Sequence, residues 1–197
     1  MTNTEHQKKI AHAYDKTFFG FWVYLMTDLI MFGVLFAAYA VLKHSTHGGP
    51  GAAELFSLPL ALSETLILLT SSFTCGLGVI AARSGNLRKT LLWFGLTFVL
   101  GVAFLSLELM EFSELVHEGY DWGRSAFLSS FFALVGTHGL HIFSGLLWMV
   151  VIFGYLIKRG LNEGIIRKLT LLGVFWHFLD IVWIFIFTIV YLFAGLI

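Results

Sequence analysis

The sequence predicts an all-α membrane protein in which five helices cross the bilayer. Of its 197 residues, 58% are hydrophobic and only 12% are charged, too few charges to cover a soluble domain of this size. Its two prolines, Pro50 and Pro59, fall in one short segment, so long helices can run uninterrupted elsewhere. Five separate apolar runs each reach the length of roughly 20 residues that crosses a bilayer as a helix.

The five predicted spans cover residues 18–42, 60–82, 90–110, 127–157 and 169–194. Residues 1–17 are polar and are expected to form a tail outside the membrane, with no apolar stretch typical of a cleavable signal peptide. Residues 18–197 then form a single membrane domain without internal repeats. Pro59 suits the first turn of the second helix, and the fourth span is long enough to tilt or to project beyond the bilayer.

The distribution of basic residues predicts the orientation of the chain, because Lys and Arg concentrate on the cytoplasmic side. One side of the predicted topology holds ten of the twelve basic residues, namely Lys8, Lys9, Lys16, Arg83, Arg88, Lys89, Lys158, Arg159, Arg167 and Lys168. The other side holds only Lys43 and Arg124. We therefore expect a cytoplasmic N-terminus and, after an odd number of spans, a C-terminus on the opposite, periplasmic face.

Ionisable side chains within the spans are the candidate functional residues, since such groups are costly in lipid and normally face protein or water. They are Asp28, Glu64, Glu108, His138, His141, His177 and Asp180. Counting about 1.5 Å per residue from the cytoplasmic end predicts two layers, at depths of roughly 12 to 17 Å and roughly 24 to 28 Å. The inner cluster contains Asp28, His177 and Asp180. The outer cluster contains Glu108, His138 and His141, with Glu64 as a further candidate.

Three interpretations of these clusters stay open. In the default one they are structural, with carboxylates and imidazoles hydrogen-bonding across helices where no water can satisfy them. In the second they relay protons. In the third the chain is an independent membrane-bound b-type cytochrome or metal enzyme that uses His138, His141 and His177. Di-iron bundles need Glu-x-x-His from two helices, and this chain has one, from Glu114 to His117, in a predicted loop.

Other chemistry is not indicated by the sequence. The single cysteine, Cys75, excludes an intrachain disulfide and a Cys-based metal site. No nucleophile with a neighbouring base, Gly-rich phosphate loop or dinucleotide fingerprint occurs, so we expect no catalytic residue in this chain. The net charge of zero gives no reason to expect nucleic acid as a partner. Interfacial anchoring or lipid contact is expected for Trp22, Trp93, Trp122, Trp148, Trp176 and Trp183.

Two late segments resemble subunit III of haem-copper terminal oxidases: FFALVGTHGLHIFSGLLWM at 131–149 and FWHFLDIVWIFIFTIVYL at 175–192. An early segment, GFWVYLMTDLIMFGVLFAAYAVL at 20–42, resembles the bacterial cytochrome bo-type ubiquinol oxidase branch in particular. The resemblance covers nearly the whole chain after the tail. Longer relatives have seven spans, and this chain lacks counterparts of the first two. Asp28 stands at the place of a buried acidic residue that in those relatives is a carbodiimide-reactive glutamate.

The resemblance implies a non-catalytic accessory subunit of a respiratory complex that oxidises quinol and reduces oxygen to water while moving protons. It implies that haem and copper reside in partner subunits, chiefly subunit I, and that this chain packs against subunit I, stabilises it and supports proton uptake. Further implied partners are other oxidase subunits and membrane lipids, including a bound phospholipid. The implied location is the bacterial cytoplasmic (inner) membrane. The donor stays open between ubiquinol, menaquinol and cytochrome c, because subunit III binds none of them.

Overall fold

The computed structural model describes residues 3–193, with side chains for residues 16–193 apart from Ala53. The described part of the chain is helical apart from short connecting segments and contains no strand. In order, its elements are α1 (Asn3–Leu42), α2 (Ala52–Leu55), α3 (Leu58–Arg83), α4 (Leu87–His117), α5 (Ala126–Arg159), α6 (Glu163–Ile186) and a π-helical segment, Phe187–Leu192. Five of the helices are long and apolar enough to cross a membrane, which confirms the predicted fold class and number of spans.

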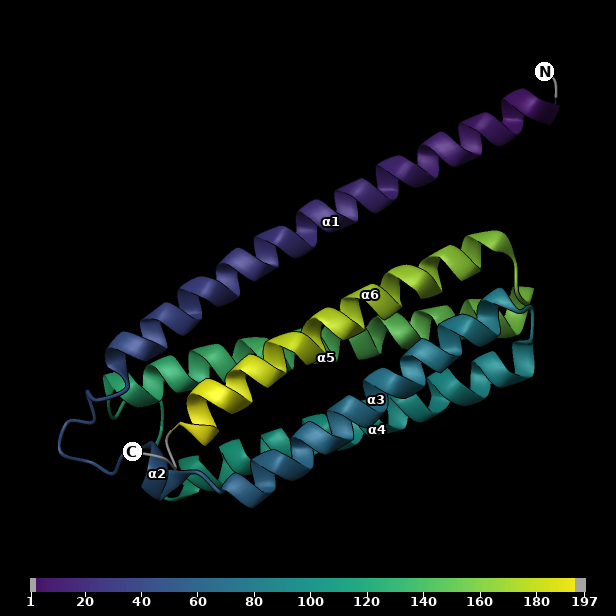
Figure 1. Ribbon diagram of the computed structural model, residues 1–197. Helices are drawn as coiled ribbons and strands as arrows, with labels where there is room; N and C mark the ends of the chain where they lie inside the picture. The colour runs from purple at the N-terminus through teal and green to yellow at the C-terminus, as the bar shows by residue number, and fades with distance from the viewer. Residues whose placement is uncertain (1–2, 194–197) are drawn as a thin grey trace.

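Helices extend beyond the apolar runs that predict them, most of all α1, α4 and α6. The helix α1 begins at Asn3, so the backbone of the expected tail is helical and continues the first span out of the bundle (Figure 1). The helix α4 continues past residue 110 to His117. Glu111 and the Glu-x-x-His segment from Glu114 to His117 are therefore helical, and the prediction of a loop there is wrong. Hydropathy marks where a helix leaves the apolar layer, whereas its backbone hydrogen bonds continue into the polar region.

Short polar segments separate the long helices and define their ends. Three helices begin at a side-chain cap: Asn86 accepts a hydrogen bond from the backbone N–H of Lys89, Ser125 from Leu128 and Asn162 from Ile165. In α3 a proline occupies the first turn, as expected for Pro59. Gly160 ends α5 with a φ of 65°, a left-handed conformation that a glycine adopts without strain. These turns let consecutive helices run antiparallel.

The helices form an elongated bundle in which α3 packs along α4 and α6, and α5 packs along α4, α6 and α1 (Figure 1). The helix α1 packs mainly on α5 and to a smaller extent on α6, and it diverges from the bundle towards its N-terminus (Figure 1). Many side chains of α1 are exposed and apolar, among them Phe19, Ile30, Val34 and Val41. An apolar surface of this kind suits lipid or another membrane subunit.

Two tryptophans of α6 form the centre of the bundle. Trp176 and Trp183 are almost completely buried, and their indole N–H groups donate hydrogen bonds of 3.0 Å to the hydroxyls of Ser71 and Thr65 on α3. The expectation that these two residues anchor at the membrane interface or contact lipid is therefore wrong. A buried indole needs a partner for its N–H, and α3 supplies one at each level.

Candidate functional site

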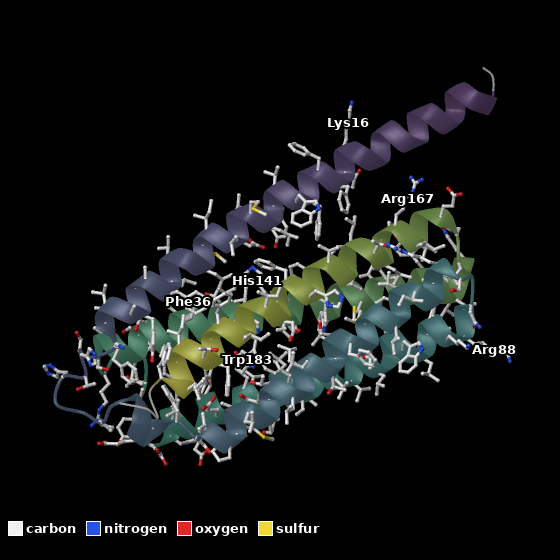
Figure 2. All side chains as sticks on the ribbon, in the orientation of Figure 1. Lys16, Phe36, Arg88, His141, Arg167 and Trp183 are labelled. Carbon is white, nitrogen blue, oxygen red and sulfur yellow. The ribbon has the colours of Figure 1, made fainter. Side chains whose placement is uncertain are left out.

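The first pair of buried polar side chains joins α1 to α5. Asp28 Oδ2 lies 3.7 Å from His141 Nε2, and both side chains are largely shielded; Figure 2 labels His141. His141 Nδ1 donates a hydrogen bond of 2.8 Å to the carbonyl of Thr137, one turn earlier in α5. This bond fixes the ring so that Nε2 faces the carboxylate. Asp28 and His141 thus form the polar contact that holds the divergent helix α1 to the bundle.

The second group joins α6 to α3. His177 Nδ1 lies 2.6 Å from the hydroxyl of Ser72, and Asp180 lies close to both side chains. Asp180 is buried, but one of its oxygens, Oδ1, has no hydrogen-bond partner in the described part of the chain. His177 itself is exposed on the surface of the isolated chain. The prediction that His177 and Asp180 lie together matches this arrangement.

The third group consists of three carboxyl groups between α3 and α4. Glu64, Glu108 and Glu111 are buried and lie within electrostatic range of one another. Glu111 accepts a hydrogen bond of 2.9 Å from the hydroxyl of Tyr191. Neither oxygen of Glu64 or Glu108 has a partner within residues 16–193. An ionised carboxylate placed in such surroundings without a cation would cost several kcal/mol or more.

His138 lies inside the bundle, enclosed by aromatic rings. The centroid of its ring lies 5.3 Å from Trp183, 5.9 Å from Phe104 and 6.4 Å from Phe32. The side chain is fully buried, and neither ring nitrogen finds a hydrogen-bond partner among the described residues. Its environment is therefore that of a core aromatic side chain.

The expected composition of the two clusters needs correction. The structure places Asp28 beside His141, so Asp28 does not join His177 and Asp180, and His141 does not join Glu108. The depth count failed because it took the cytoplasmic end of the fourth span as the membrane surface. α5 has 34 residues and is about 51 Å long, so it projects well beyond a hydrocarbon layer of about 30 Å. Glu64 and Glu108 do lie together, as predicted.

The expectation that acids and imidazoles hydrogen-bond to one another also needs correction. Among residues 16–193, the one acid–imidazole contact given across helices is the Asp28–His141 pair, and its distance of 3.7 Å is too long for a hydrogen bond. Glu64, Glu108 and His138 have no hydrogen-bond partner among residues 16–193. The hydrogen bonds between helices are made instead by hydroxyls and indoles, such as Ser72 with His177 and Ser71 with Trp176.

Sequence reasoning missed several partners in these groups. Tyr191 was not singled out, although its hydroxyl is the donor to Glu111. Ser71 and Ser72 are likewise the α3 partners of two α6 side chains. The available signal was the i, i+3 spacing of Glu108 and Glu111, which predicts that both face the same neighbour. The partners themselves come from distant parts of the sequence, and no local spacing indicates them.

In the described part of the chain, the geometry gives no support for a metal site built from the histidines. Within it, no three His, Cys, Asp or Glu side chains gather so that they could hold a metal ion. His138 could offer a ring nitrogen to a haem only if the rings of Phe104 and Trp183 moved aside. His177 is bonded to Ser72 on another helix.

A groove of about 570 Å³ separates α1 from α6. Its wall combines aliphatic and aromatic side chains, the latter being Trp22, Phe32 and Phe36 from α1 and Phe178 and Phe185 from α6. His177 is the only ionisable residue that lines it.

Comparison with known proteins decides the family of this chain. The sequence profile of the family described as cytochrome c oxidase subunit III matches residues 2–195.

The chain belongs to this family. The cytochrome bo(3) ubiquinol oxidase subunit 3 of Pseudomonas aeruginosa is 52% identical to it over 188 residues, which cover 94% of this chain and 90% of the relative. The quinol oxidase subunit 3 of Bacillus subtilis is 46% identical and covers 88% of this chain and 85% of its own length. The cytochrome c oxidase subunit 3 of a Bacillus species is 47% identical, with coverages of 89% and 84%.

The resemblance to subunit III of terminal oxidases is thereby confirmed. As a member of the subunit III family, the chain is one subunit of an oxidoreductase complex, and its partners are oxidase subunits. With five helices able to span a bilayer and bacterial relatives, it is a multi-pass protein of a bacterial membrane.

Proposed function

We propose that this subunit III is a non-catalytic accessory subunit of a bo-type quinol oxidase in the cytoplasmic (inner) membrane. In this proposal it packs against subunit I and stabilises it, while haem and copper reside in subunit I. Relatives named as subunits of ubiquinol and quinol oxidases support the choice of complex.

The observation that carries the accessory role is the direction in which the polar side chains point. Asp28, Glu108 and Asp180 face other helices of the same chain, and none lines a polar cavity that could admit a substrate. The outer surface offers exposed apolar side chains, most of all on α1. A chain built in this way contributes helix packing to a complex. The groove beside His177 is apolar apart from that one side chain.

We also propose that the subunit supports proton uptake by the complex. Glu64 and Glu108 are buried carboxyl groups with neither a cation nor a hydrogen-bond donor within residues 16–193. Such groups are rare within spans and are typical of proteins that hold or relay protons.

We propose a cytoplasmic N-terminus and a periplasmic C-terminus. The labelled basic residues Lys16, Arg88 and Arg167 lie towards the same end of the bundle (Figure 2), and basic residues concentrate on the cytoplasmic side. Single cysteines introduced by Ser84→Cys and Ser45→Cys, in a chain with Cys75→Ala, would lie at opposite ends. A membrane-impermeant maleimide added to intact cells should label the Ser45→Cys variant alone. Labelling of the Ser84→Cys variant alone would show the opposite orientation and contradict the proposal.

Deleting this subunit from the oxidase tests the accessory role. We expect the membranes to retain most of the oxidase haem spectrum, because the chain holds no redox centre in this proposal. The purified complex should lose activity faster during sustained turnover and should dissociate at lower temperature. An assembled complex that had lost quinol binding altogether, or that lacked haem, would contradict the proposal.

A further inference from the structure

A polar cleft of about 580 Å³ lies where the loop between α1 and α2 meets the start of α5. The two segments are joined there by a hydrogen bond of 3.3 Å from the backbone N–H of Phe127 to the carbonyl of Ser45, at one end of the bundle (Figure 1). We call this hollow the loop cleft. Its polar lining residues are Ser45, His47, Arg124, Ser125 and Ser129, and no acidic residue of the described chain lines it.

Arg124 is held in position without a carboxylate. Its Nη1 donates a hydrogen bond of 3.0 Å to the carbonyl of Gly119, and its guanidinium carbon lies 5.0 Å from the centroid of the Tyr120 ring. The ion pairs within residues 16–193 use other cations, His141 and Arg167. A guanidinium has five N–H donors. Arg124 therefore keeps its charge and donors for a ligand in the cleft.

The start of α5 adds positive potential to the same cleft. Ala126, the first residue of this helix, is exposed and lines the cleft, and a helix N-terminus carries about half a positive elementary charge. The nearest acidic residue in sequence, Asp121, accepts a hydrogen bond of 3.0 Å from the backbone N–H of Gly123 and does not line the cleft. The charge of the cleft thus fits an anion from outside the described chain.

The size and the rim of the cleft favour a polypeptide as the source of this anion. A volume of about 580 Å³ is far larger than one carboxylate or inorganic anion, and it lies within the range of roughly 300 to 1,000 Å³ that takes larger ligands. Trp122 also lines the cleft, two residues before Arg124, and is 65% exposed. Tryptophan and arginine are the side chains most enriched at the energetic centres of protein interfaces.

We propose that the loop cleft binds an aspartate or glutamate side chain from a loop of a neighbouring oxidase subunit. The carboxylate accepts hydrogen bonds from the Arg124 guanidinium, and Trp122 packs against the segment that carries it. The proposal needs only that the chain is one subunit of an oxidase complex. It is independent of the buried polar groups, of the proposed role in proton uptake and of the proposed orientation.

The test changes the charge of the cleft without touching Arg124. Ala126→Glu places a carboxylate in the cleft, and an acidic residue in the first turn of a helix is itself favourable, so this variant should fold. Ala126→Gln is the matched control, because it adds a side chain of the same size without charge. Photo-reactive p-benzoylphenylalanine replaces Ser45, which is exposed and lines the cleft. The purified, assembled oxidase is irradiated, and mass spectrometry identifies the cross-linked segment.

We expect a cross-link from position 45 to a segment of another oxidase subunit that contains an acidic residue. Its yield should fall about tenfold or more in Ala126→Glu, because like charges then oppose each other, and should stay unchanged in Ala126→Gln. Arg124→Gln should also lower the yield, whereas Lys43→Gln, which removes a positive charge outside the cleft, should not.

Three outcomes would overturn the proposal. The first is an equal yield in Ala126→Glu and Ala126→Gln, which would show that charge does not govern binding. The second is a cross-linked segment that lacks an acidic residue. The third is an assembled complex in which the photo-reactive group couples to phospholipid alone or to no other subunit.

Discussion

Replacing Gly101 with alanine should destabilise the bundle, because the new methyl group has no room. A Cβ at this position of α4 would lie 2.9 Å from two ring atoms of Trp176 and 3.0 Å from Leu146 Cδ2. Trp176 cannot move away easily. Gly145 of α5 lies against the same ring, where a Cβ would approach to 3.0 Å. The indole N–H of Trp176 also donates a hydrogen bond of 3.0 Å to the hydroxyl of Ser71.

The size of the effect follows from comparison with a second glycine of α4. Overpacking a tight core costs about 1 to 3 kcal/mol, whereas glycine to alanine within a helix contributes about 0.5 to 1 kcal/mol of stability. Gly95 has nothing within 4 Å of its Cβ position, so Gly95→Ala receives only the second contribution. We therefore expect the unfolding free energy of Gly101→Ala to be about 1 to 3 kcal/mol below that of Gly95→Ala.

Unfolding of the purified chain in detergent by increasing dodecyl sulfate, followed by circular dichroism, measures this difference. The variant Trp176→Phe shortens the ring that Gly101→Ala would meet. The double variant should therefore be less destabilised than the sum of the two single changes. Equal stability of Gly101→Ala and Gly95→Ala would refute the close packing of α4 against Trp176, and strict additivity in the double variant would refute the assignment to that contact.

Three further changes test the polar groups. Ser72→Ala removes the hydrogen bond to His177 and should lower the unfolding free energy by about 1 kcal/mol, as measured by the same titration, whereas an unchanged midpoint would argue against the bond. Asp28→Asn should alter packing or proton uptake modestly without abolishing oxygen reduction, which oxygen-electrode assays of the complex check. Glu108→Gln keeps the shape of the side chain and removes its ability to ionise, so the loss of unfolding free energy should stay below the roughly 3 to 5 kcal/mol that follows when one partner of a buried ion pair is removed; a loss of that size would indicate a buried ion pair instead.

The spans and the family could be predicted from the sequence, because both depend on local information. A run of about 20 apolar residues must satisfy its backbone as a helix in lipid, whatever surrounds it. The family resemblance is also local, because it rests on two continuous segments, one around His138 and His141 and one around Trp176. Helix ends were less accurate. α4 continues through Glu111 and Glu114, since charged side chains outside the apolar layer do not interrupt a helix.

The grouping of the buried polar residues could not be predicted in the same way. Depth counting treats every helix as an upright rod that starts at the membrane surface, and the long α5 departs from this. As a result Asp28 was assigned to His177 and Asp180, although it lies beside His141. The hydroxyl and indole partners were also missed, because a serine in α3 and a tryptophan in α6 are separated by about a hundred residues in the chain.

The sequence by itself determined that this chain crosses a membrane five times, that it carries seven ionisable side chains within its spans, and which family it resembles. Only the tertiary structure decided which of those side chains meet, that Trp176 and Trp183 are core residues bonded to α3, and that Glu64 and Glu108 are buried without partners. The physical reason is that transfer into lipid is a property of each segment alone. Side-chain pairing depends instead on the tilt, length and close approach of different helices.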